Sequence, residues 1–253
     1  AESGLYIYNL RTGKYVHLRS SINDPYSLSD NAIYSLCKDR EGGIWIGSYF
    51  GGINYYPRFY TNFEKYYPKG AANGLQGKRV REFCQDNQGI LWIGTEDGGL
   101  NRFNPKTKTF SFFTPSNAFT NVHGLCMVGD NLWVGTFSKG VKVVDTRTGT
   151  IVKTYLKTES PHSLVDNSVF SICRTTTGDI YLGTLFGLLR YNKQLDGFDR
   201  IPELNGKFVY DIKEDSGGNL WLATYANGAY CYNVNEKRWK NYLHDENNPK
   251  SLP

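Results

Sequence analysis

The stretch that decides the fold is Leu91-Trp92-Ile93-Gly94-Thr95, because close variants of it recur along the chain. The variants are Ile44-Trp45-Ile46-Gly47-Ser48, Leu132-Trp133-Val134-Gly135-Thr136, Ile180-Tyr181-Leu182-Gly183-Thr184 and Leu220-Trp221-Leu222-Ala223-Thr224. Their aromatic positions lie 47, 41, 48 and 40 residues apart. Repetition at this period is typical of architectures that stack one supersecondary unit many times.

Each repeat predicts four short strands. In one repeat, residues 80–84 form the first strand and the Trp92 stretch forms the second. The turn between them runs from Asp86 to Gly89, where Asp accepts local backbone hydrogen bonds and Gly takes positive φ. The third strand begins at Gly99, and residues 109–113 form the fourth. No segment shows a sustained helical period, so we expect no helix of consequence.

Four strands in each repeat of about 40–50 residues predict an all-β fold, a β-propeller of four-stranded antiparallel blades. A solenoid would have shorter repeats, and a sandwich has no reason to repeat its sequence. We expect five full blades and two outer strands of another, as part of a seven-bladed propeller or of a tandem pair. The outer strands occupy residues 1–20, the blades occupy 21–68, 69–115, 116–158, 159–203 and 204–245, and residues 246–253 lead into a further blade.

The composition excludes several classes of protein. The chain has 253 residues, 40% hydrophobic and 15% aromatic, so it can bury enough apolar surface to fold. No apolar run approaches the roughly 18 residues of a spanning helix, so we expect no membrane insertion by this chain. The net charge of +5 is spread without a run of like charge, so no direct nucleic-acid contact is expected.

Residues 86–100, Asp-Asn-Gln-Gly-Ile-Leu-Trp-Ile-Gly-Thr-Glu-Asp-Gly-Gly-Leu, resemble the two-component regulator propeller repeat almost position by position. The other four repeats fit it with modest departures: Tyr181 for Trp, Ala223 for Gly, and a shorter turn at residues 129–131. The resemblance implies the periplasmic sensor of a hybrid two-component system histidine kinase from a glycan-degrading gut bacterium. It also implies an oligosaccharide ligand, a kinase and transcriptional output elsewhere in the parent inner-membrane protein, and a homodimer formed through the parent ectodomain.

Strand alternation predicts the candidate ligand site. The loops between second and third strands and the links into first strands share one end of the propeller, here called the top face. Aromatic rings stack on the C–H faces of sugars, and polar groups pair with their hydroxyls. The candidates are Tyr49, Phe50, Arg79, Arg81, Glu96, Asp97, Phe137, Lys139, Phe186, Tyr225 and Asn227.

Each candidate has a structural alternative. Phe50, Phe137 and Phe186 could instead cap the packing between blades. Arg79 and Arg81 could bind a carboxylate or sulfate in two-point fashion, or pair with Glu82 or Glu96. The position of Arg81 is occupied in the other repeats by Tyr34, His123, Phe170 and Tyr210.

We expect no catalysis, cofactor or metal. The four histidines lack metal-ligand spacing, and no nucleophile or phosphate motif occurs. Glu96 and Asp97 are adjacent on one loop, which rarely places two carboxylates on opposite sides of a glycosidic bond. A scaffold for protein interaction or dimerisation, and a lyase or sialidase-like enzyme, are the competing functions.

Two residue types report on the packing of the blades. We expect the four repeat tryptophans to be buried between blades: Trp45, Trp92, Trp133 and Trp221. Four cysteines share one repeat position and are expected to be reduced, buried fillers: Cys37, Cys84, Cys126 and Cys173.

Overall fold

The computed structural model describes residues 3–22, 24, 26–58, 64–68, 73–113 and 118–252. It divides into two compact units, residues 1–71 and 72–253, and each is considered by itself. Antiparallel β-sheets dominate both units, and a short 3-10 helix, η2 (Pro202–Leu204), precedes one blade. Within the described parts of the chain, no helix is long and apolar enough to cross a membrane.

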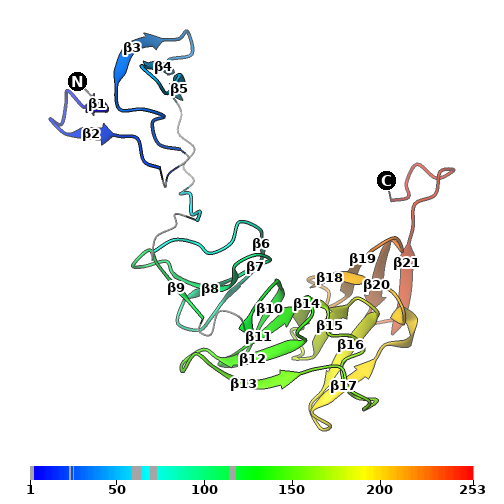
Figure 1. Ribbon diagram of the computed structural model, residues 1–253. Helices are drawn as coiled ribbons and strands as arrows, with labels where there is room; N and C mark the ends of the chain where they lie inside the picture. Colours follow the sequence, from blue (N-terminus) through cyan, green and yellow to red (C-terminus); the bar gives the residue numbers. More distant parts are fainter. Residues whose placement is uncertain are drawn as a thin grey trace. The chain divides into compact units, whose positions relative to one another are not determined.

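The second unit contains four antiparallel sheets of four strands, each with its strands in chain order. Figure 1 shows these sheets following one another from β6 to β21. The first strands of successive sheets lie against each other, so β6, β10, β14 and β18 form the inner edge of the blades. The strands are β6 (Val80–Gln85), β7 (Leu91–Thr95), β8 (Gly99–Asn104), β9 (Thr109–Phe112), β10 (Val122–Val128), β11 (Asn131–Thr136), β12 (Val141–Asp145), β13 (Thr150–Tyr155), β14 (Val169–Arg174), β15 (Ile180–Thr184), β16 (Gly187–Asn192), β17 (Gly197–Arg200), β18 (Val209–Glu214), β19 (Leu220–Thr224), β20 (Ala229–Asn233) and β21 (Arg238–Tyr242).

The first unit contains a two-stranded sheet, β1 (Leu5–Tyr8) and β2 (Tyr15–Leu18), within the residues predicted to form two outer strands. Its other sheet has three strands, β3 (Ile33–Lys38), β4 (Ile44–Ser48) and β5 (Ile53–Tyr56). Residues 59–63 lie outside the described residues, and residues 64–68 form no strand. The chain is therefore a partial β-propeller, and the exact blade boundaries stay predictions.

The aspartate of the first hairpin turn explains why Asp, Gly and Trp recur together. In the repeat of Asp86, one carboxylate oxygen accepts the backbone N–H groups of Gln88 and Ile90 at 2.9 and 3.0 Å. The other oxygen accepts the indole N–H of Trp92 at 2.9 Å. Gly89 takes a φ of +80°, which favours glycine. The turn thus fixes the backbone and the tryptophan orientation with one side chain.

At three of the repeats, the glycine two residues after the aromatic residue of the second strand makes room for the next blade. A Cβ on Gly183 would lie 2.8 Å from the backbone oxygen of Val209, which belongs to the following inner strand. Gly94 and Gly135 face Val122 and Val169 of their following strands in the same way. In the last sheet the position is Ala223, which is exposed because no described sheet covers that face.

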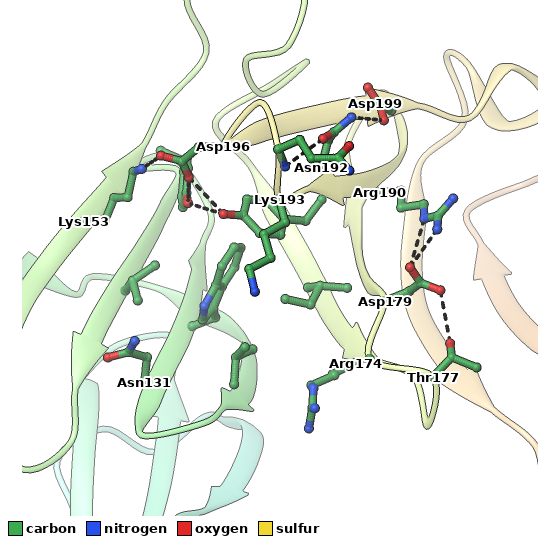
Figure 2. Close-up of a pocket in the computed structure, with 18 of the residues that line it drawn as sticks. Asn131, Lys153, Arg174, Thr177, Asp179, Arg190, Asn192, Lys193, Asp196 and Asp199 are labelled. Atoms are coloured by element: carbon green, nitrogen blue, oxygen red, sulfur yellow. Dashed lines mark hydrogen bonds and ion pairs between the residues drawn. The ribbon is translucent and has the colours of Figure 1, made fainter.

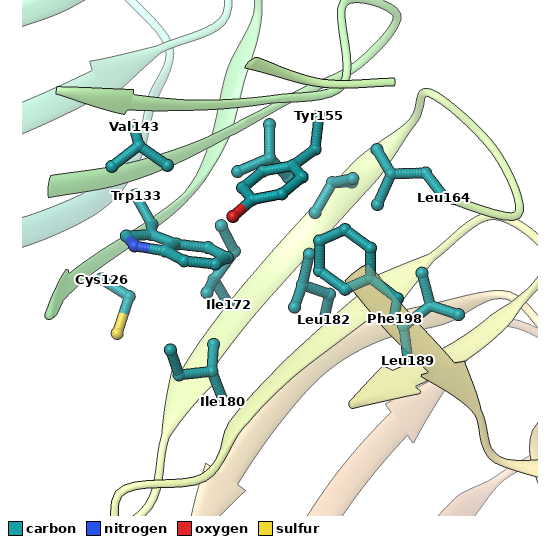
Figure 3. Packing of buried hydrophobic residues seen from close by; sticks show 12 residues of the cluster. Cys126, Trp133, Val143, Tyr155, Leu164, Ile172, Ile180, Leu182, Leu189 and Phe198 are labelled. Carbon is teal, nitrogen blue, oxygen red and sulfur yellow. The ribbon is translucent and has the colours of Figure 1, made fainter. Parts of the chain in front are cut away.

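The hydrophobic core lies between consecutive sheets. Figure 3 shows one cluster in which Trp133 of β11 and Tyr155 of β13 face Ile172 and Leu182 of the next blade. Trp92 packs in a second cluster with Val122 of the next inner strand. Trp92 and Trp133 therefore each point toward the blade that follows, which is the packing expected of propeller blades.

Two of the four repeat tryptophans are buried as predicted, and two are not. Trp92 and Trp133 are 2% and 5% exposed, as expected. Trp45 and Trp221 are 45% and 40% exposed, so the prediction is wrong for these two. The reason is their place in the chain: each lies in the last sheet of its unit, where no following sheet of that unit covers the indole.

All five cysteines carry free thiols. Cys126 is buried and Cys84 and Cys173 are half-buried, so they fill space between blades. Burial raises the pKa of Cys126 to about 12, which makes its thiolate scarce at neutral pH. Cys37 is exposed, contrary to the expectation, because it lies in the uncovered sheet of the first unit.

Candidate functional site

The top face is tied together by the same hydrogen bond in every blade. The residue that follows the second strand donates its backbone N–H to the carbonyl just before the first strand. Examples are Glu96 to Arg79 at 3.0 Å and Phe137 to Asn121 at 3.0 Å. The loops after second strands and the links into first strands therefore lie at one end of each sheet.

Each inner strand has a β-bulge near its start, where one extra residue interrupts the regular alternation of side chains between the two faces of the sheet. In β6, Val80 pairs with Thr95 and Glu82 with Gly94, which leaves Arg81 as the extra residue. The other inner strands shift register at the same place. The bulged residues of the second unit are Arg81, His123, Phe170 and Tyr210, which we call the axial cluster. Bulges often re-aim a side chain at a functional site.

The four members of the axial cluster contact one another although they come from four blades. Arg81 donates a hydrogen bond to the hydroxyl of Tyr210, and its guanidinium lies 5.0 Å from the centre of that ring. Phe170 stacks on Tyr210 with centroids 5.9 Å apart and meets His123 edge-on at 4.8 Å. The cluster therefore joins a cation to a continuous aromatic surface.

An ion-pair network borders the cluster on the side of β7. Glu96 forms ion pairs with both arginines. Its carboxylate lies 3.5 Å from Nε of Arg81 and 3.6 Å from a guanidinium nitrogen of Arg79. Of the two pairings that the sequence left open, the one with Glu96 is present. The side chain of Arg79 is 75% exposed, so it remains accessible to a ligand.

Aromatic residues extend the surface on its other side. Phe208 lies 4.4 Å from Phe170, and Tyr225 lies 5.9 Å from Phe208, measured between ring centroids. Phe137 meets Phe170 edge-on at 6.0 Å. Tyr225 is 70% exposed and Phe137 is 45% exposed, so the outer rings face solvent while Phe170 is buried.

His123 is a buried imidazole with a spare nitrogen. Its Nε2 lies 2.8 Å from the side-chain oxygen of Asn121, and its Nδ1 has no partner among the described residues. Burial, assisted by the positive charge of Arg81, lowers the pKa of His123 to about 4. The ring is therefore neutral at pH 7, and it contributes an aromatic face rather than a charge.

Two predicted residues lie in the first unit and form a separate group. The rings of Tyr49 and Phe50 lie 4.2 Å apart, and Tyr34, the bulged residue of β3, lies 4.9 Å from Tyr49. The carboxylate of Asp30 accepts the backbone N–H of Phe50 at 3.1 Å. The repeat geometry thus gathers three exposed aromatic rings in this unit as well.

The remaining predicted residues lie in the loops that follow second strands: Asp97, Lys139, Phe186 and Asn227. Asp97 accepts the backbone N–H groups of residues 78 and 79, which lowers its pKa and ties down the loop. Lys139 and Phe186 donate backbone N–H groups within their own loops. Asn227 is half-buried in the loop between β19 and β20.

Sequence reasoning missed four members of this surface: His123, Phe170, Phe208 and Tyr210. Three of them share the repeat position of Arg81, so the signal was the alignment of the repeats itself. Among the described residues, no group of three or more His, Cys, Asp or Glu could hold a metal ion.

Three segments of the chain match the family described as two component regulator propeller: residues 27–50, 74–97 and 203–226. At these three segments the chain is similar to two-component regulator propeller repeats. The three matched repeats are those with both an aspartate in the turn and a tryptophan bonded to it. No curated protein matches the chain.

Several solved structures are similar to this chain in fold. One is described as the extracellular domain of a hybrid two component system from B. thetaiotaomicron; it is 25% identical, with a TM-score of 0.59 over 98% of this chain and 32% of that chain. Another, from a one component system of the same organism, is 19% identical, with a TM-score of 0.58 over 97% of this chain and 41% of that one.

A third similar structure is PorZ, described as a surface component of the type-IX secretion system of Porphyromonas gingivalis. It is 16% identical, with a TM-score of 0.52 over 86% of this chain and 34% of that chain. At 16% and 19% identity, the likeness shows the fold alone. The chain spans only about a third to two fifths of the chains it resembles.

Proposed function

We propose that this chain is a ligand-sensing propeller segment from the extracellular or periplasmic region of a hybrid two-component system. The two-component regulator propeller repeats support this proposal, as does the 25% identical extracellular domain of such a system. A kinase and a transcriptional output would then lie elsewhere in the parent protein, and this chain would supply recognition without turnover.

We further propose that the ligand is an oligosaccharide and that it binds over the axial cluster. The observation that carries this proposal is the convergence of Arg81, His123, Phe170 and Tyr210 from four blades. Exposed rings at Phe137 and Tyr225 offer stacking surfaces for sugar C–H faces, and the Arg79–Glu96 pair offers both donors and acceptors for hydroxyls. A ligand that contacts several blades at once would be sensitive to their relative positions.

Calorimetry of the 253-residue chain against a panel of neutral and acidic glycan fragments tests this proposal. We expect at least one fragment to bind, and Arg81→Gln to weaken that binding by about tenfold or more, since hydrogen bonds to charged groups are the stronger ones. Tyr225→Ala, at an exposed rim position, gives a second variant that does not disturb the core. Lys106→Gln is the matched control, because Lys106 lies in the turn between β8 and β9, away from the top face.

Binding that is unchanged in both Arg81→Gln and Tyr225→Ala would contradict the placement of the site. A different function, an interaction or dimerisation scaffold, is favoured by the three exposed rings of Tyr34, Tyr49 and Phe50, since exposed apolar patches often mark protein contacts. Absence of glycan binding together with a concentration-dependent dimer in sedimentation would support the scaffold. Cleaved fragments in the same panel would indicate an enzyme.

A further inference from the structure

A groove of about 810 Å³ lies between the second and third sheets of the second unit. It is bordered by Asn131 at the start of β11 and by the turn residues Gly178 and Lys193, which lie at the end of the sheets opposite the axial cluster. Its volume falls within the range of about 300–1,000 Å³ that is typical of small-molecule sites. Figure 2 shows its walls contributed by strands of both blades.

The wall of the groove is aromatic. Trp133 and Tyr155 stack with ring centroids 5.4 Å apart, and Tyr191 meets Trp133 edge-on at 4.9 Å. All three residues line the groove. A ring-shaped ligand can therefore lie against an aromatic surface that is already assembled.

Trp133 differs from the other repeat tryptophans in its indole N–H. Trp45, Trp92 and Trp221 each donate this group to the aspartate of their own turn. The turn before Trp133 is shorter, and no described residue accepts its indole N–H. The groove therefore contains an indole N–H donor that, in the other repeats with a tryptophan, is bonded to the turn aspartate.

The acidic residues of the groove already have partners. Asp179 binds Arg190 at 2.7 Å, and Asp199 accepts the side-chain amide of Asn192 at 2.9 Å. Asp196 pairs with Lys153 and accepts hydrogen bonds from the hydroxyls of both lining tyrosines. Asp179 and Asp196 are thus paired with lining cations, whereas Asp199 lies 3.3 Å from the imidazole of His162.

Two lining cations have no acidic partner in the described chain, namely Arg174 and Lys193. Both are exposed, and Figure 2 shows Lys193 between Asn131 on one wall and Arg174 on the other. An arginine and a lysine facing one space favour a ligand with negative charge, and guanidinium matches carboxylate geometry well.

We propose that this groove binds a small ligand in which a carboxylate is attached to a six-membered ring, either a sugar acid or an aromatic acid. Arg174 and Lys193 hold the carboxylate, the aromatic wall contacts the ring, and Asn131 and the indole N–H of Trp133 are placed to bond its polar substituents. The groove is separate from the axial cluster, so this site is independent of the proposed oligosaccharide site.

Calorimetry of the whole 253-residue chain with D-glucuronate, benzoate and D-glucose tests the proposal. We expect glucuronate or benzoate to bind, and the tighter ligand indicates whether the natural ligand is a sugar acid or an aromatic acid. Glucose lacks the carboxylate and should not bind. The double variant Arg174→Gln, Lys193→Gln should weaken binding by about tenfold or more. Binding should also weaken as salt is added, because the two cations are exposed to solvent.

The matched control is Lys106→Gln, Lys237→Gln, which removes the same charge from two turns that do not line the groove. Arg81→Gln, which acts on the axial cluster, should likewise leave binding unchanged. Three outcomes would overturn the proposal: no heat with either carboxylate, glucose binding as tightly as glucuronate, or full affinity in the double variant.

Discussion

At the scale of single residues, the aspartate of the hairpin turn is the most informative side chain. Asp215 accepts the indole N–H of Trp221 at 2.9 Å and the backbone N–H groups of Gly217 and Asn219 at 2.9 Å each. These hydrogen bonds, the one from Trp221 first, lower the pKa of Asp215 from 3.8 to about 2. A carboxylate with so many donors stays ionised in acid that would protonate an ordinary aspartate.

The lowered pKa predicts how stability depends on pH. Because the folded pKa of Asp215 lies below the unfolded one, its contribution is complete above pH 3.8 and is lost as the pH falls through about 2. Asp215→Asn keeps an acceptor for the turn but cannot titrate. We therefore expect the difference in free energy of unfolding between the native chain and this variant to shrink as the pH falls from about 4 to about 2. Urea unfolding at several pH values measures this difference. Parallel curves for the two proteins would contradict the assignment.

The sequence indicated some residues of the candidate surface and did not indicate others. Arg79, Arg81 and Glu96 were found because charged residues are conspicuous in links and loops that share one end of the sheets. The aligned repeats placed His123 and Phe170 at the position of Arg81, but neither was chosen as a candidate, because strand alternation does not show that a bulge re-aims this side chain. Only the superposition of several repeats shows that these side chains occupy the position of Arg81.

At the scale of the sheet, the glycine of the tryptophan strand sets how closely two blades approach. Ala223 shows that the strand itself accepts a methyl group where no described sheet covers it. Gly183 occupies the same repeat position but faces the backbone of Val209. Backbone atoms cannot rotate away as a flexible side chain can, so an added methyl group must push the two blades apart.

We expect Gly183→Ala to lower the free energy of unfolding by about 1–3 kcal/mol, which is typical of overpacked cores. The reverse change at the uncovered position, Ala223→Gly, should cost only the about 0.5–1 kcal/mol that glycine costs in a strand interior. Urea unfolding followed by circular dichroism measures both. Equal effects of the two substitutions would show that the distance between blades does not constrain this position.

At the scale of the whole molecule, the repeat predicted the architecture, but it left open whether the blades belong to one propeller or to a tandem pair. A period near that of a propeller blade, with Asp, Gly and Trp at fixed places, is enough to define a four-stranded sheet. It carries no information on which consecutive sheets stack. The exposure of Trp45 and Trp221 follows from that missing information, since each indole needs the blade after it to become buried.

The two units also differ in how much apolar surface they bury. The four clusters of buried hydrophobic residues found in the described chain all lie within residues 72–253. In the described part of the first unit, Leu28 and Ile46 are the buried hydrophobic residues. Since burial of apolar surface is the main favourable term in folding, the first unit should be the less stable of the two.

We therefore expect the 253-residue chain to unfold in two steps in urea, with the first unit unfolding at the lower concentration. Hydrogen exchange at increasing urea assigns the steps: amides of β3 to β5 should lose protection while those of β10 to β19 remain protected. Gly183→Ala gives the internal control, because it acts between blades of the second unit and should move only the later step. A single transition, with both sets of amides losing protection together, would show that the two units fold as one cooperative body.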